Sequence, residues 1–150
     1  MSDELLYCIR VLITHPTLTP EELSGEFSLK PRMSKCVGQP RRTPKGTPMP
    51  GVWPDTRWSV QEVRNGDRYF FTRLDKLLDR FSQHRDFLRR IAETGGRTNF
   101  IIELPGEANI GNTLTEQSIA KLADLKGSLG VEVFPGMKPM EDEYIWPDDP

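Results

Sequence analysis

The first residues of the chain alternate between hydrophobic and mixed positions. One face of an extended segment here is entirely apolar: Leu5, Tyr7, Ile9, Val11 and Ile13. This period of two predicts an interior strand of a sheet that is covered on one side. Segments 58–63, 98–104 and 131–134 predict three further strands, the last of which is closed by Pro135.

Helical spacing is clearest between residues 71 and 93. Apolar residues recur there at intervals that form one stripe: Leu74, Leu77, Leu78, Phe81, Leu88 and Ile91. The pattern predicts one long amphipathic helix, which Gly95 and Gly96 stop. Shorter helices are expected after Thr19 and Thr113, because Glu22 and Glu116 can complete a capping box at each site.

The elements follow the order strand, helix, insert, strand, long helix, strand, helix, strand. This order predicts an α+β fold, a two-layer sandwich whose mainly antiparallel sheet of about four strands carries helices on one face. A ferredoxin-like arrangement is one candidate. A chain of 150 residues is long enough to form one domain with a sizeable core. We assign residues 1–137 to this domain.

A basic insert at about 30–57 interrupts the periodic pattern. Residues 30–58 hold six of the thirteen prolines and one carboxylate, Asp55, and their cations are Lys30, Arg32, Lys35, Arg41, Arg42, Lys45 and Arg57. The insert is too rich in proline for a helix or a central strand, and it is longer than ordinary connections, which favours a functional loop. Because tryptophan and arginine dominate binding hot spots, we nominate these partner-binding residues: Arg41, Arg42, Lys45, Trp53 and Arg57.

The net charge of −2 favours neither a nucleic acid nor a membrane as partner. Residues 138–150 form an acidic C-terminal tail outside the predicted domain, with Glu141, Asp142, Glu143, Asp148 and Asp149. Two interpretations stay open. The insert and the tail are separate solvated segments, or the tail folds back over the insert or competes with its ligand.

Motifs for chemistry are scarce. The chain has no Gly-x-Ser-x-Gly sequence, no phosphate-binding glycine signature and no cysteine or histidine pair at metal-ligand spacing. We therefore predict no catalytic residue, no metal and no cofactor. An enzyme using His84, Glu103 or Glu107 is the weakest hypothesis, because the sequence nominates no nucleophile and no orienting carboxylate for them. Two cysteines and the lack of a signal-peptide or spanning pattern favour a cytoplasmic protein without a membrane partner.

Several landmarks over roughly residues 5–135 together resemble a bacterial family, Domain of Unknown Function 4279. They are the apolar first strand, Thr19-Pro20-Glu21-Glu22, Leu29-Lys30-Pro31, Lys45-Gly46, Trp58-Ser59, the long helix and Phe134-Pro135. The loop His15-Pro16-Thr17-Leu18 departs from the Gly-Asp type turn expected there. The resemblance implies a small bacterial α+β domain and no activity. Such domains look like immunity partners of secreted toxins.

Two main functions follow as hypotheses. The first is a non-enzymatic protein-binding domain, such as an immunity or inhibitor protein that neutralises a bacterial toxin. The alternative is a nucleic-acid-binding module that uses the same basic loop at 30–57. The two differ in salt dependence, since about five neutralised phosphates give a slope of about −4.5 for duplex DNA.

Overall fold

The computed structural model describes residues 5–149 and contains one five-stranded sheet. Its strands are β1 (Leu6–His15), β2 (Met33–Lys35), β5 (Thr56–Asn65), β6 (Arg97–Pro105) and β7 (Gly127–Phe134). They lie in the order β2-β5-β1-β6-β7, with β1 antiparallel to both neighbours and β6 parallel to β7. The α+β class is as predicted, but the sheet is mixed and has five strands rather than about four.

The parallel pair is incompatible with a ferredoxin-like arrangement. In that arrangement the βαβ units are split, so the two strands that flank a helix are separated by another strand. Here α4 (Glu116–Asp124) connects β6 to β7, and these two strands are direct neighbours. The ferredoxin-like expectation is therefore wrong.

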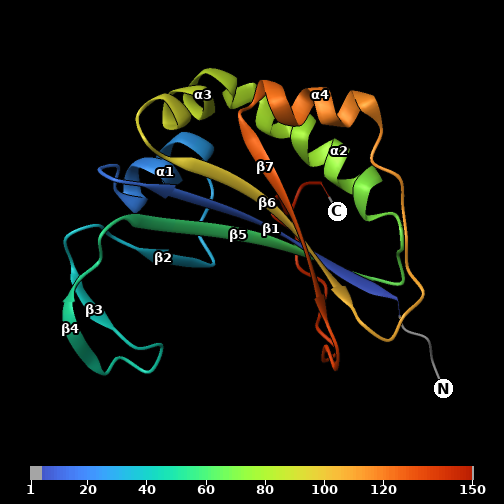
Figure 1. The fold of residues 1–150 in the computed structure, drawn as a ribbon, viewed down its shortest axis with the longest axis horizontal. Helices are drawn as coiled ribbons and strands as arrows, with labels where there is room; N and C mark the ends of the chain where they lie inside the picture. The colour runs from blue at the N-terminus through green and yellow to red at the C-terminus, as the bar shows by residue number, and fades with distance from the viewer. Residues whose placement is uncertain (1–4, 150) are drawn as a thin grey trace.

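The helices cover one face of the sheet (Figure 1). Besides α4 they are α1 (Pro20–Phe27), α2 (Phe70–Phe81), the 3-10 turn η1 (Ser82–His84) and α3 (Arg85–Glu93). The single helix predicted over 71–93 is thus broken at η1. The Ser82 hydroxyl donates a hydrogen bond to the carbonyl oxygen of Asp79 there, and such side-chain bonds to the preceding turn bend helices. The break lets α3 pack on β6.

The hydrophobic core lies between the helices and the sheet. The face of β1 predicted from the alternation supplies Tyr7, Ile9, Val11 and Ile13 to it. Trp58 of β5 is fully buried, and its indole N–H donates to the Ser24 hydroxyl of α1 at 3.0 Å. Burial of such a side chain contributes on the order of 2–3 kcal/mol, so Trp58 fixes α1 on the sheet.

Local sequence rules predict one helix start correctly and miss another by two residues. At α1, Thr19 Oγ1 accepts from the Glu22 amide at 3.1 Å, and the Glu22 carboxylate accepts from the Thr19 amide at 3.3 Å. At α4, Thr115 rather than Thr113 is the N-cap residue, and it accepts from the Ser118 amide at 3.2 Å.

The C-terminal segment, residues 138–149, packs onto the domain. Ile145 and Trp146 are buried in the core, and the Trp146 ring meets Phe81 edge-on with 4.9 Å between centroids. Glu143 exchanges two backbone hydrogen bonds with Val63, which closes part of the outer edge of β5. The sequence assigns residues 1–137 to the domain. In the structure, Ile145 and Trp146 anchor the acidic segment 138–149 on it, so the domain extends to residue 149.

A buried ion-pair cluster holds the end of this segment to the helix layer. Glu62, on the helix side of β5, is fully buried and accepts hydrogen bonds from Arg73 of α2 and from Arg64. Arg73 also donates to the carbonyl oxygen of Asp149 at 2.9 Å. Burial acts to lower the pKa of Arg73, but the hydrogen bonds and charge of Glu62 outweigh it, and the pKa is raised. The Arg73 guanidinium thus stays charged and links Glu62 of the sheet to Asp149.

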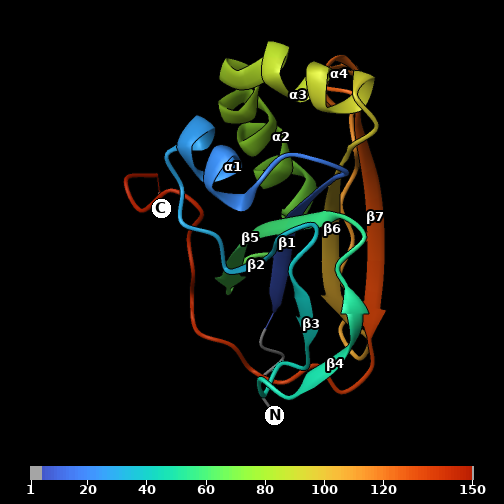
Figure 2. The ribbon, with the colours of Figure 1, turned by 90° about the vertical axis from the view of Figure 1, so that its left-hand side faces the viewer.

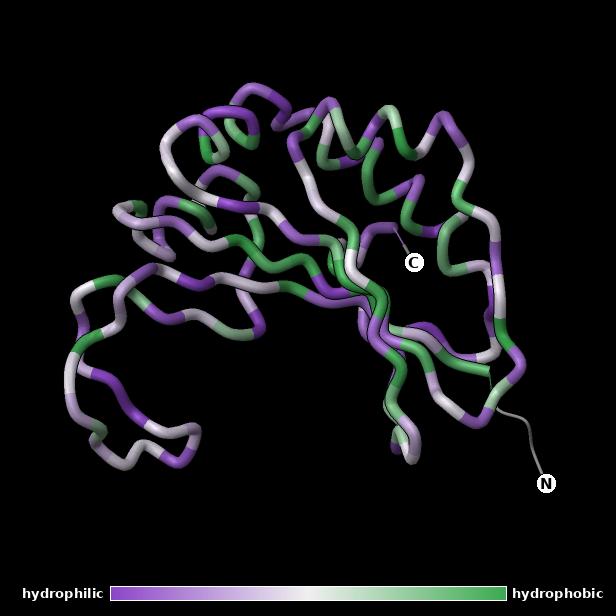
Figure 3. The backbone as a smooth tube through the Cα atoms, in the orientation of Figure 1, coloured by the Kyte–Doolittle hydropathy of each residue, from purple (hydrophilic) through white to green (hydrophobic). Residues whose placement is uncertain are grey.

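The insert is ordered. β2 pairs with β5, and β3 (Pro40–Arg42) and β4 (Pro48–Val52) form a separate hairpin. Figures 1 and 2 show this hairpin standing off the sheet on the side opposite the helices. Figure 3 shows that the hairpin is mostly hydrophilic, whereas hydrophobic residues concentrate in the central strands and the helices. Its prolines are tolerated because both strands of a two-stranded hairpin are edge strands.

Candidate functional site

The hairpin β3–β4 has a defined conformation. In its turn the Thr43 amide donates to the Thr47 carbonyl oxygen at 2.9 Å, and the Gly46 amide donates to the Thr43 carbonyl oxygen at 2.8 Å. Gly46 has a φ of 86°, a region that favours glycine. At the base, the Trp53 amide donates to the carbonyl oxygen of Gln39 at 2.9 Å. These bonds hold both ends of the hairpin in place.

Trp53 is the centre of a cation–aromatic cluster at this base. Lys35 Nζ lies 4.1 Å from the centroid of its ring, and the guanidinium carbon of Arg41 lies 5.4 Å from it. Arg57 is the neighbour of Lys35 across the β2–β5 pair. We call Lys35, Arg41, Trp53 and Arg57 the Trp53 cluster. The sequence nominated the other three and missed Lys35, because only the pairing of β2 with β5 brings that residue to the site.

The remaining nominated cations lie toward the hairpin tip. Arg42 is exposed and donates from Nη1 to the Gly46 carbonyl oxygen at 3.2 Å, and Lys45 is exposed in the turn. Residues 35–57 contain five cations and one carboxylate, Asp55, which lies 3.4 Å from Arg57 Nε. The hairpin and the adjoining strand end therefore present a net positive surface.

Arg41 has an unused donor. Its Nε atom is buried and has no hydrogen-bond partner within residues 5–149. A buried donor without an acceptor costs on the order of 1–3 kcal/mol. A partner cannot reach this enclosed atom, so an acidic or carbonyl-bearing group would contact Arg41 through the terminal guanidinium nitrogens of the half-buried side chain.

Beside the hairpin lies the sheet face that the helices leave uncovered (Figure 1). Near its centre, Arg10 lies 3.6 Å from Glu103 of β6 and 3.8 Å from Glu132 of β7, so this charge in mid-strand pairs with carboxylates of neighbouring strands. Glu107 accepts a hydrogen bond from the Gly136 amide instead. Glu103 and Glu107 thus bind different groups, an arginine side chain and a backbone amide.

The acidic residues of the C-terminal segment engage other cations. Glu143 lies 2.8 Å from Arg32 at the start of the insert, and Asp148 lies 3.2 Å from Arg80 on α2. Within the described part of the chain, no carboxylate of this segment forms an ion pair with the Trp53 cluster. Of the two interpretations left open by the sequence, the fold-back over the insert thus reaches Arg32 at its start, without an ion pair to the Trp53 cluster.

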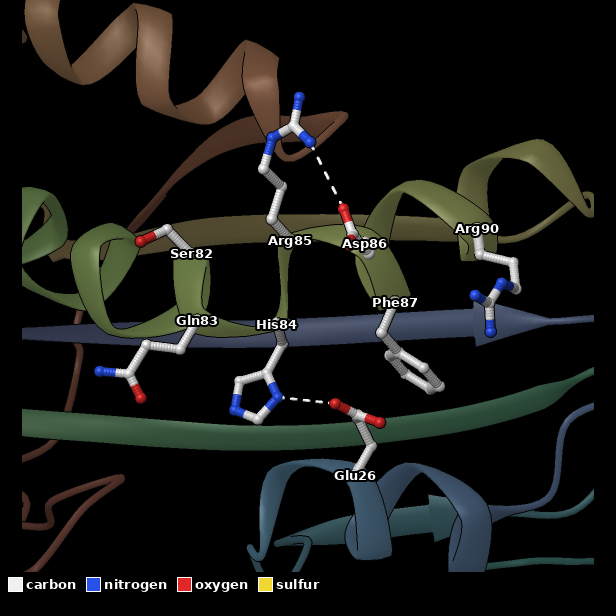
Figure 4. Close-up of a pocket in the computed structure, with 8 residues that line it drawn as sticks. All are labelled: Glu26, Ser82, Gln83, His84, Arg85, Asp86, Phe87 and Arg90. Atoms are coloured by element: carbon white, nitrogen blue, oxygen red, sulfur yellow. Dashed lines mark hydrogen bonds and ion pairs between the residues drawn. The ribbon is translucent and has the colours of Figure 1, made fainter.

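A second candidate lies at the break between α2 and α3, in a polar cavity of about 420 Å³ (Figure 4). His84 Nδ1 lies 2.8 Å from a carboxylate oxygen of Glu26, and its ring packs edge-on against Phe27. Glu26 is the orienting carboxylate that the sequence does not nominate. Ser82 points away from His84 in Figure 4, toward the carbonyl oxygen of Asp79. Among residues 5–149, no hydroxyl or thiol other than Ser82 lines this cavity, so we assign the pair no catalytic role.

Comparison of this chain with protein-family models, with curated proteins and with solved structures gave no match. The resemblance to Domain of Unknown Function 4279 stays a prediction. Among residues 5–149, no three metal-ligating side chains come together, and no helix is both long and apolar enough to cross a membrane. The hairpin and the Trp53 cluster are therefore the features that point to a function.

Proposed function

We propose that this chain is a non-enzymatic binding domain that contacts an acidic surface of another protein through the hairpin β3–β4 and the Trp53 cluster. The observation that carries the proposal is the Trp53 ring with Lys35 and Arg41 over it. Tryptophan and arginine are the side chains that dominate protein interfaces. Cation–π contacts also hold these long side chains in place, which reduces the entropy lost when a partner binds.

The same geometry favours a protein over a nucleic acid. Proteins bind single strands by stacking bases on accessible aromatic rings. The Trp53 ring is half-buried with two cations against it, and Trp58 is fully buried, so a base would first have to displace Lys35 or Arg41. The net charge of −2 also weakens long-range attraction to phosphates.

The partner class that we propose is a bacterial toxin, which the domain would neutralise as an immunity or inhibitor protein. An inhibitor gains affinity from a surface that is already ordered before binding. The hydrogen bonds at the turn and base of the hairpin supply such order. The resemblance to a small bacterial domain without catalytic motifs supports the same partner class.

Affinity capture from a nuclease-treated lysate of the source organism tests this function. We expect the wild type to retain one protein near stoichiometry, and the double variant Lys35→Gln/Arg41→Gln to lose it. Lys76→Gln/Arg90→Gln is the matched control, because both residues are exposed in the helix layer and form no ion pair within the described residues. A partner that is captured from untreated lysate and lost after nuclease treatment would indicate a nucleic acid. Equal retention by both double variants would exclude the hairpin as the binding surface.

A further inference from the structure

β7 is an edge strand without the usual protection. No strand within residues 5–149 pairs with its outer side, whereas the opposite edge of the sheet is closed by β2 and by Glu143. Natural edge strands are usually short, bulged, or marked by proline or lysine. β7 keeps a regular register with β6 over eight residues, contains neither proline nor lysine, and has Glu132 as its one charge. Glu132 lies 3.8 Å from Arg10 of its own sheet.

Apolar side chains are exposed along this edge. Val131 is 52% and Val133 is 58% exposed, and Ile119 of α4 is 51% exposed. Val131 pairs in register with Ile102 of the core, so Val131 and Val133 point to the helix side, where α4 packs on β7. Exposed apolar residues next to an open strand edge mark an interaction surface rather than ordinary surface.

We propose that β7 pairs antiparallel with β7 of a second copy of this chain, around a two-fold axis perpendicular to the sheet. A two-fold interface joins the same surface on both subunits, so the strand must be complementary to itself. The two five-stranded sheets then form one continuous sheet. The hairpin β3–β4 connects β2 to β5, at the other end of the strand order from β7, and supplies no residue to this strand pair, so this dimer does not depend on the proposed function.

The side chains of β7 define the register. With Val131 opposite its own copy, Leu129 faces Val133 twice, and Glu132 faces Gly130. Every helix-side pair at the centre is then apolar, and cross-strand pairs of this kind stabilise sheets. The next register in one direction places Glu132 opposite Glu132 of the second copy, and like charges directly opposite each other destabilise a strand pair. The next register in the other direction places Val133 opposite Gly127, which has no side chain to pack.

This self-complementarity favours a second copy of the chain over a strand of another protein as the partner of β7.

Cysteine cross-linking of the full chain, in a Cys36→Ser background, tests the proposed dimer. Val131→Cys should give a disulfide-linked dimer on mild oxidation, because directly opposed positions of an antiparallel pair lie within disulfide reach. Gly130→Cys alone should not cross-link, whereas an equal mixture of the Gly130→Cys and Glu132→Cys proteins should. Gly130 tolerates the change, since an added Cβ meets Ile101 at 3.6 Å.

Sedimentation measures the monomer–dimer equilibrium without an introduced cysteine. The wild type should be a dimer, and Val131→Lys should raise the dimer Kd by about tenfold or more. Val52→Lys is the matched control, because Val52 is 54% exposed but lies on the hairpin, and it should leave the Kd unchanged. A wild type that stays monomeric overturns the proposal, as does a monomer that binds the extended segment of a different protein. Cross-linking by Gly130→Cys alone, without Val131→Cys, overturns the register.

Discussion

The ammonium nitrogen of Lys35 lies 4.1 Å from the centroid of the Trp53 ring, although the whole hairpin β3–β4 separates the two residues along the chain. Lys35 ends β2, which is paired with β5 of the central sheet. The contact therefore ties the base of the hairpin to the rigid part of the domain. It also places a cation, an indole ring and the Arg41 guanidinium at one location, which is the basis of the proposed binding surface.

The two tryptophans of this region should respond differently to removal. Trp53→Ala should reduce the free energy of unfolding by about 1 kcal/mol or less, because the ring is half-buried and loses mainly its cation contacts. Trp58→Ala should cost about 3–5 kcal/mol, because the ring is fully buried in the core. Chemical denaturation followed by circular dichroism measures both. Equal losses would place Trp53 in the core and would contradict its assignment to the binding surface.

The C-terminal segment should be required for stability. Trp146→Ala should destabilise the domain by about 3–5 kcal/mol, because it opens a cavity against Phe81. Asp148→Asn is the control in the same segment. Its ion pair with Arg80 is exposed, so its loss should cost less than about 1 kcal/mol. A small effect of Trp146→Ala in thermal or denaturant unfolding would mean that residues 138–149 are not part of the cooperative domain.

Loss of the Glu62 charge should be costly for a different reason. Glu62→Gln leaves the buried Arg73 guanidinium without its main counter-charge, and breaking a buried pair in this way costs about 3–5 kcal/mol. The comparison is Asp55→Asn, whose pair with Arg57 is partly exposed and should contribute less than about 1 kcal/mol. Urea unfolding of both variants measures the difference, and similar values for the two would contradict the buried cluster.

His15 should make stability depend on pH. Burial lowers the pKa of His15 despite the opposing charge of Glu22, and its Nδ1 accepts hydrogen bonds from the Thr17 and Leu18 amides at 3.0 Å each. The unfolded chain therefore takes up the proton first. The free energy of unfolding should be at its full value above about pH 6.5 and should fall as the pH drops toward the lowered pKa.

A His15→Asn variant is the control for this pH effect. The side-chain oxygen of asparagine can accept from the same amides, as in an Asx-turn, but it does not titrate between pH 5 and pH 8. The variant should lack the part of the pH dependence that His15 causes. Identical profiles for wild type and variant, measured by denaturant unfolding at pH 5 to pH 8, would show that His15 titrates normally in the folded state.

Features set by neighbouring residues could be predicted from the sequence. The alternation in β1 shows its buried face, and the capping box of Thr19 and Glu22 is a local arrangement that forms as expected. The strand predicted at 58–63 forms as part of β5, and its first residue, Trp58, lies in the core. In each case the residues that determine the structure lie within one strand or one helical turn of each other.

Features that depend on distant pairing could not be predicted. The three residues of β2 are too few to show a period, and their strand forms because β5 offers an edge. Ile145 and Trp146 are two apolar residues among acids, so no pattern reveals that they complete the core. Lys35 and Glu26 likewise gain their neighbours, Trp53 and His84, only through the fold.

Zero-length cross-linking of the captured complex, with the linked peptides identified by mass spectrometry, tests the proposed surface most directly. Carbodiimide joins a lysine to a carboxylate only when the two are in contact. We predict links from Lys35 and Lys45 to carboxylates of one partner protein, and none from Lys76, which is exposed on α2. Links confined to Lys76 or to other lysines of the helix side would contradict a partner bound at the Trp53 cluster.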